Sequence, residues 1–189
     1  EGDDHGPGSY VYPTDPLFAP GSYDLTGFSV GESGDDLVFT FDLAAPVLNP
    51  WDSPSGLSIQ TLDVYVDTDP GTGNGARRFL PGRNASWESG SGWDRALTIE
   101  GWYPALYLAD PDGTTTETEP TFKVLVFSDR GRVTARIPRE LFGEGSPSEW
   151  SYAVAVMSQE GFPSPGVRRV RDVEPNAAQW RIGGGDGSI

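Results

Sequence analysis

The sequence predicts a single all-β domain, an antiparallel β-sandwich of the jelly-roll type, and three observations support this fold class. The chain of 189 residues contains 25 Gly and 17 Pro, a combination that disfavours helices and suits tight turns. Turn-forming residues interrupt short apolar runs roughly every eight to twelve residues, as in antiparallel sandwiches. Six Trp, seven Tyr and nine Phe supply large surfaces for a core and argue against disorder.

Strand patterns follow a turn-rich opening over residues 1–24. The first lies at residues 23–30, and the second, from Leu37 to Leu43, alternates apolar and polar side chains as a half-buried strand does. A longer run at 57–66 keeps this alternation with one mismatch. Further strands are expected at 76–80, 96–100, 105–109, 121–127, 132–137, 150–157, 167–170 and 179–182. Only residues 138–142, ended by Gly143, fit a helical turn.

The length suits one β-sandwich rather than two independent domains. We therefore assign residues 1–182 to a single domain and expect residues 183–189 to form a Gly-rich flexible segment. The chain contains no Cys, which excludes disulfides and thiolate metal sites. Because it opens at Glu1 rather than Met, we expect a mature or excised piece whose export signal lies upstream, and a secreted or cell-surface location.

The charge balance narrows the choice of partners. Thirteen Lys and Arg oppose 28 Asp and Glu, so the formal net charge is -15. Such a surface repels phosphate backbones and anionic lipids, and no apolar run approaches the roughly 20 residues that span a bilayer. We therefore expect no nucleic-acid partner and no membrane span. The scarcity of Lys, with Lys123 alone, also fits a halophilic source, in which case the acidity reflects habitat.

Two acidic loops have the composition of calcium sites. Calcium takes six to eight hard oxygen ligands, which carboxylates and the carbonyls of Gly-rich turns supply. In both loops, an ordinary solvated acidic turn remains the alternative. The candidate ligands are Asp3, Asp4, Asp15 and Asp24 of the N-terminal segment, and Asp67 and Asp69 of the second loop.

Loop tryptophans are candidate sugar platforms, because sugars stack their CH faces on indoles while polar neighbours bind the hydroxyls. Core packing is the competing interpretation for each of them, and it is favoured for Trp150 and Trp180 inside strand patterns. The candidates are Trp51, Trp93 and Trp102, with Arg77, Arg83 and Asn84 as polar partners. Catalysis has little support, because His5 is the single histidine and 28 acids form many pairs without indicating one.

Several motifs, in this order along the chain, resemble one family. They are Gly2-Asp3-Asp4-His5-Gly6-Pro7-Gly8, Tyr10-Val11-Tyr12-Pro13-Thr14, Phe18-Ala19-Pro20-Gly21-Ser22-Tyr23-Asp24-Leu25, Asn49-Pro50-Trp51, Val64-Tyr65-Val66-Asp67-Thr68, Trp93-Asp94, Gly101-Trp102 and Gln179-Trp180-Arg181-Ile182-Gly183-Gly184-Gly185. The set resembles the C-terminal domain of glucodextranases, which is also appended to pullulanase-like and other amylolytic enzymes.

The resemblance implies a sandwich similar to family 9 carbohydrate-binding modules and the DOMON-like group. It implies a structural Ca²⁺ near the N-terminal segment, assigned first to Asp3, Asp4 and Asp24. It also implies an exported, non-catalytic accessory role, covalently linked to a catalytic domain that acts on α-glucan polysaccharides or oligosaccharides. Two functions follow: a calcium-stabilised carbohydrate-binding module of a glycoside hydrolase, or a calcium-stabilised structural or cell-surface-anchoring domain without a sugar site.

Overall fold

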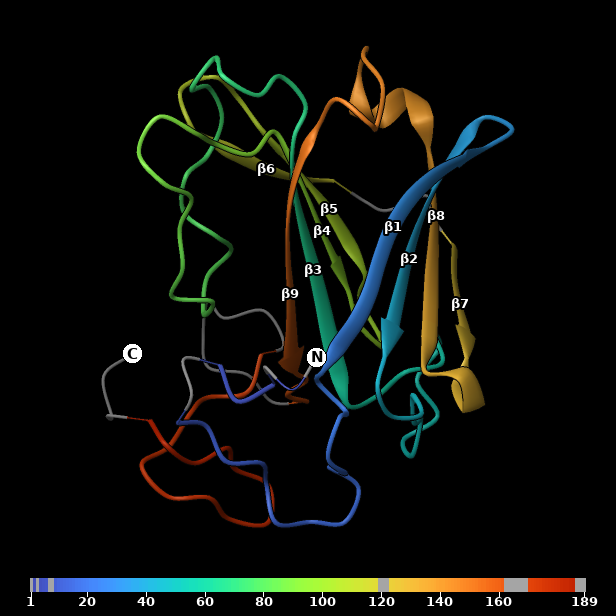
Figure 1. Cartoon of the computed structure of the whole chain (residues 1–189), viewed down its shortest axis with the longest axis vertical. Coiled ribbons are helices and arrows are strands. Elements are labelled where there is room, and N and C mark those ends of the chain that lie inside the picture. The colour runs from blue at the N-terminus through green and yellow to red at the C-terminus, as the bar shows by residue number, and fades with distance from the viewer. Residues whose placement is uncertain (1, 3, 7–8, 119–122, 162–169, 186–189) are drawn as a thin grey trace.

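Two antiparallel sheets face each other in the computed structural model, which describes residues 2, 4–6, 9–118, 123–161 and 170–185 (Figure 1). Within these residues the first sheet has the order β1-β2-β8-β7 and the second the order β6-β5-β4-β3-β9. The all-β, antiparallel fold class predicted from the sequence is thus confirmed. The strands of the first sheet are β1 (Leu25–Ser33), β2 (Asp36–Leu43), β7 (Lys123–Phe127) and β8 (Arg132–Pro138). Those of the second are β3 (Gln60–Asp67), β4 (Arg95–Ile99), β5 (Ala105–Ala109), β6 (Thr115–Thr118) and β9 (Ser151–Ser158).

The alternation of β2 places its apolar side chains in the core between the sheets. Leu37, Phe39 and Phe41 are fully buried, whereas the residues between them are half-buried on the outer face. Their partners on the second sheet include Leu62 and Val64 of β3, which belong to the same core cluster. Two-residue periodicity therefore decides which side chains enter the sandwich.

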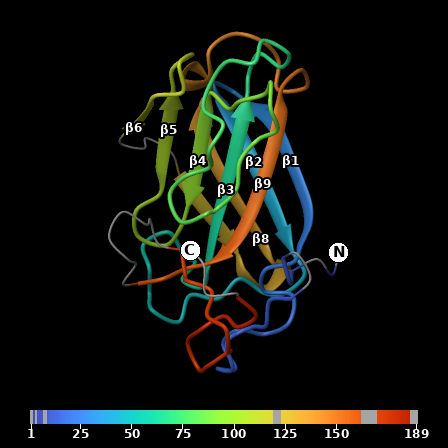
Figure 2. The same ribbon diagram turned by 90° about the vertical axis from the view of Figure 1, so that its left-hand side faces the viewer.

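Strand β3 departs from this alternation because both of its faces are covered. All eight of its residues are buried, including the polar Thr61 and Asp63 on the outer face. Figure 2 shows the reason: the long loop between β3 and β4 crosses in front of this sheet. Residues 76–80, predicted as a strand, belong to that loop and form only isolated bridges, one of which joins Ala76 to Trp93.

Other boundaries differ for local reasons. Strand β6 has the polar sequence Thr-Thr-Glu-Thr at the sheet edge. The sequence did not predict this strand, because it shows no alternation of apolar and polar residues there. The predicted strand at 121–127 is β7, and residues 121 and 122 lie outside the described part. Of the predicted strand at 167–170, residues 167–169 also lie outside it, and Val170 makes an isolated bridge. The predicted helical turn is the 3-10 segment η2 (Arg139–Phe142), followed by Gly143 at φ 75°. No described helix is long and apolar enough to cross a membrane.

Segments from the two chain ends pair beneath the sandwich (Figure 1, bottom). The Thr14 and Asp15 amides donate to the carbonyls of Ala178 and Gln179, at 2.9 and 3.2 Å. Gly183, predicted to be flexible, exchanges two backbone hydrogen bonds with Val11. We call residues 9–18 and 170–185 the terminal layer; the remaining residues of the predicted flexible segment, 186–189, lie outside the described part.

Candidate functional site

The N-terminal segment brings Asp4 under cover beside the turn that leads into β1. Its side chain is 8% exposed and accepts hydrogen bonds from the Tyr12 hydroxyl and, at 3.3 Å, from the Gly21 amide. Burial, together with the hydrogen bond to Asp4, raises the pKa of Tyr12, so this phenol remains a donor to the carboxylate at neutral pH. The predicted Asp3 lies outside the described residues.

Asp24 approaches the same turn from its other side. Its amide donates to the Gly21 carbonyl at 3.2 Å, and its Oδ2 accepts the Gly2 amide at 2.8 Å. Its second oxygen, Oδ1, is buried and makes no hydrogen bond with the described residues. A buried carboxylate oxygen without a partner is costly, and a hard cation is a ligand that would relieve that cost. The described residues here would offer such a cation the carboxylates of Asp4 and Asp24.

Asp15, also predicted as a ligand, is used differently. Its Oδ1 accepts the Leu17 amide at 3.1 Å, and its Oδ2 accepts the Gln179 side-chain amide at 3.0 Å. The carboxylate thus shapes a turn in one terminal segment and binds the other. Both carboxylate oxygens of Asp15 are therefore used within the terminal layer.

A second group of carboxylates lies at the other end of β3. Oxygens of Asp67, Asp69 and Asp94 lie within 4.8 Å of one another. The sequence predicted the first two as metal ligands; the tertiary structure adds Asp94, whose amide donates to the Val66 carbonyl at 2.8 Å. Burial, followed by the charges of Asp94 and Asp69, raises the pKa of Asp67, so this carboxyl is harder to ionise in the folded protein.

The tryptophans divide into core and surface. Trp93, a predicted platform, is 1% exposed, contacts the Tyr65 ring and donates its indole N–H to the Arg78 carbonyl at 2.9 Å. Its faces are occupied by protein, so it offers no surface to a sugar. Trp51 is 41% exposed, and its ring centre lies 6.0 Å from that of Trp180. Trp102 is half-buried, with its amide donating to Glu100 at 2.9 Å.

The predicted polar partners are also separated. The Arg83 guanidinium forms a bidentate ion pair with Asp63 at 2.7 and 3.1 Å, and the two side chains are 1% and 0% exposed. Burial lowers the pKa of Arg83, but the adjacent carboxylate more than offsets this and raises it. Asn84 is exposed at φ 46°, and Arg77 is exposed with one 3.4 Å bond to the Trp87 carbonyl.

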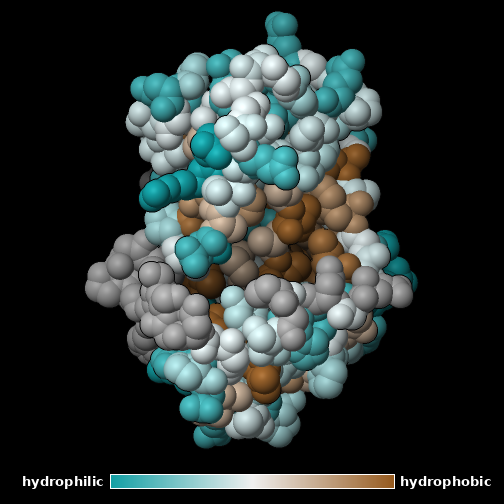
Figure 3. All heavy atoms as spheres, turned by 60° about the vertical axis from the view of Figure 1, so that its left-hand side comes forward, coloured by the Kyte–Doolittle hydropathy of each residue, from teal (hydrophilic) through white to brown (hydrophobic). Residues whose placement is uncertain are grey.

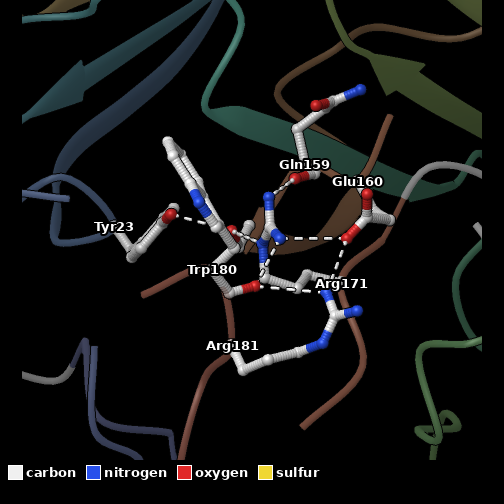
Figure 4. A network of polar contacts seen from close by, with 7 residues as sticks. Tyr23, Gln159, Glu160, Arg171, Trp180 and Arg181 are labelled. Carbon is white, nitrogen blue, oxygen red and sulfur yellow. Dashed lines mark hydrogen bonds and ion pairs between the residues drawn. The ribbon is translucent and has the colours of Figure 1, made fainter. Parts of the chain in front are cut away.

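A buried arginine that the sequence analysis did not single out joins the terminal layer to β9 (Figure 4). Arg171 donates to the Gln159 and Trp180 carbonyls at 2.8 and 2.6 Å and to the Glu160 carboxylate at 2.9 Å. Two of these acceptors are backbone carbonyls of residues far apart in the chain. No local pattern reveals such a contact, because it depends on where the chain returns.

The comparisons with known proteins agree with the motif resemblance. A family profile described as the C-terminal binding module, SLH-like, of glucodextranase matches residues 1–189. No curated protein matches the chain. Because the profile spans the whole chain, and because the observed β-sandwich agrees with the fold that the resemblance implied, the chain belongs to the family of C-terminal, SLH-like binding modules of glucodextranase.

Proposed function

We propose that this domain is a non-catalytic, calcium-stabilised carbohydrate-binding module of a secreted or cell-surface glycoside hydrolase that acts on α-glucans. Its family is one of accessory binding modules, which supports the binding role and a covalently linked catalytic domain. The observation that carries the sugar-binding part is the exposed indole of Trp51, supported from behind by a second aromatic ring.

Trp51 has the surroundings that a stacking platform needs. Trp180 contacts it and in turn packs edge-on against Phe18 at 5.7 Å, so the exposed ring adjoins a chain of aromatic side chains. Asp52 follows it in a left-handed conformation at φ 49° and is exposed, which provides a carboxylate acceptor for hydroxyls. A rigid aromatic face with adjacent acceptors suits a neutral polysaccharide chain.

Calcium binding is supported by the Asp4–Asp24 pair, where a buried carboxylate oxygen lacks a protein partner. A cation there would join the N-terminal segment to the start of β1 and stabilise the folded form by mass action. The cluster of Asp67, Asp69 and Asp94 is a second place where carboxylates converge. Calcium binding by these two groups of carboxylates would account for part of the acidity of the chain. A halophilic source is the alternative explanation of that acidity.

Thermal unfolding with calcium and with chelator, at low and high salt, tests the metal. We expect a calcium-specific rise in Tm at both salt levels, a loss of most of that rise in Asp24→Asn, and retention of it in Asp112→Asn. The control removes the same charge from a solvated turn, where the exposed Asp112 accepts the Thr114 amide. An equal rise with any salt would mean that the acids form a screened surface. Loss of the rise in Asp67→Asn alone would move the metal to the second cluster.

Affinity electrophoresis in amylose, pullulan and dextran tests the sugar-binding role. Wild-type protein should be retarded in at least one of the polymers, and Trp51→Ala should migrate freely. Phe127→Ala is the matched control, because Phe127 is an aromatic residue of similar exposure, 45%, and lies on β7 of the first sheet. Unchanged migration of the wild type in all three polymers would contradict the proposal.

The second candidate is a calcium-stabilised structural or cell-surface-anchoring domain without a sugar site. The SLH-like description of the family favours it, as does the burial of Trp93 and Trp150. It predicts calcium stabilisation without retardation by any α-glucan, together with sedimentation of the domain with cell-wall preparations. Trp51→Ala should not alter that sedimentation.

A further inference from the structure

A cavity of about 590 Å³ opens beside β9, between the tip of the β3–β4 loop and the terminal layer. It lies at the edge where β1 and β9 end their respective sheets, and residues from both strands line it. In Figure 3 a hollow lined by hydrophobic side chains lies at mid-height, between more hydrophilic surfaces above and below. Its volume lies within the range of small-molecule sites, roughly 300–1,000 Å³.

The strand that borders the cavity is unusually open. Residues 151–157 of β9 are all half-buried, and β9 pairs with β3 alone among the described strands. Val154, Val156 and Met157 present apolar surface to the cavity. An edge strand also leaves backbone donors and acceptors without a strand partner. Apolar surface beside open hydrogen-bonding groups suits a ligand with an apolar face and several hydroxyls.

The remaining wall is polar and aromatic. Tyr10, Tyr12 and Asn84 contribute rings and amide groups. Arg83 and Arg171 are the two cations among the described lining residues, and each is already in an ion pair, with Asp63 and Glu160 respectively. Asp4 and Asp172 add carboxylates to the lining. These carboxylates, in a protein whose formal net charge is -15, repel an anionic ligand but do not repel a neutral one.

We propose that this cavity binds a neutral oligosaccharide. The inference rests on the proposed carbohydrate-binding function and adds a second contact, distinct from the Trp51 surface. The exposed indole stacks on a polymer, and the cavity takes a segment short enough to fit its volume. The ligand class follows from the carboxylates of the lining, the formal net charge of -15 and the apolar floor.

Isothermal titration calorimetry with maltotriose, isomaltotriose and trigalacturonic acid tests the proposal. We expect at least one neutral trisaccharide to bind and the anionic one not to bind. Met157→Phe should weaken binding about tenfold or more by filling the cavity, a change of about 1.4 kcal/mol or more. Leu125→Phe is its control, because it adds a similar ring at a 49% exposed position on β7.

Asn84→Gly provides a second test, because glycine accepts the left-handed backbone at φ 46° and removes only the side chain. It should weaken trisaccharide binding, whereas Asn74→Gly, in the exposed part of the same loop, should not. Trp51→Ala should keep trisaccharide affinity while losing retardation by polymers. Trisaccharide binding that survives both Met157→Phe and Asn84→Gly would overturn the cavity site alone. Absence of binding to any trisaccharide and any polymer would overturn the proposed function as well.

Discussion

Replacement of Arg171 by Met should destabilise the domain by separating the terminal layer from the sandwich. The guanidinium is 6% exposed and donates to four acceptors: Ser158 Oγ, Glu160 Oε2 and the carbonyls of Gln159 and Trp180. It also lies 5.4 Å above the Phe18 ring. Methionine keeps much of the length of the side chain but supplies none of these hydrogen bonds.

The magnitude follows from what the substitution leaves behind. Charge-assisted hydrogen bonds contribute about 1.5–3 kcal/mol each, but removing the guanidinium also removes the cost of burying its charge, which lowers the pKa of Arg171. Breaking a buried pair costs about 3–5 kcal/mol. Glu160 keeps a contact with Arg181 at 3.5 Å, so we expect the lower part of that range. For a chain of this size the corresponding fall in Tm is about 6–12 °C.

Urea denaturation and hydrogen exchange together provide the assay. Denaturation measures the loss of unfolding free energy, and exchange locates it. The amides of Thr14 and Asp15, which donate to carbonyls of the other terminal segment, should lose protection first. Amides between β2 and β8 should keep theirs under native conditions, because they lie in the sandwich.

Arg132→Met is the matched control. Arg132 forms a bidentate pair with Asp42 at 2.6 and 3.0 Å, but these side chains are 43% and 34% exposed, so solvent screens the pair and its loss should matter little. Equal stability of the two variants would refute the reasoning. Uniform loss of protection across both sheets would show that Arg171 supports the whole sandwich rather than the terminal layer.

Four further predictions follow from burial and backbone geometry. Trp93→Ala should lower the unfolding free energy by about 3–5 kcal/mol in chemical denaturation, since it empties a core position; a loss below about 1 kcal/mol would contradict its assignment to the core. Gly184→Ala should disorder the terminal layer in hydrogen exchange, because an added Cβ would lie 1.9 Å from the Ser9 carbonyl oxygen; unchanged protection would contradict this. Asp67→Asn should raise the Tm of calcium-free protein. Because the pKa of Asp67 is raised in the folded state, the folded protein loses stability as pH rises above the ordinary carboxyl pKa of about 4, and Asn carries no charge to cause that loss. A Tm equal to that of the wild type at pH 7 would count against this prediction. Burial raises the pKa of Tyr152 to about 12, so stability should fall as pH rises above about 10, and Tyr152→Phe should lessen that slope in an alkaline Tm series.

Local patterns predicted the fold class because the information they carry is local. The alternation from Leu37 to Leu43 identifies a strand and its buried face in one reading, and the buried pattern of β2 agrees with it. Gly and Pro mark turns through their own backbone preferences, without reference to distant residues. Local patterns did not predict β6, because a strand at the sheet edge needs no apolar side chain. They wrongly predicted a strand at 76–80, because the apolar residues of this loop cover the sheet from outside.

The candidate sites depended on contacts between segments far apart in the chain. Composition identified Asp4 and Asp24 as candidate ligands, but their common contact with the turn at Gly21 is a tertiary fact. Trp51 and Trp93 are equivalent in sequence, since both lie in polar loops, yet one is exposed and the other fully enclosed. The physical reason is that burial is decided by what packs on a side chain, and those partners come from strands and loops whose arrangement no single segment encodes. The sequence by itself determined the fold class, the main strands of the sandwich and the acidity; the tertiary structure decided which indole faces solvent, which carboxylates meet and where a cavity remains.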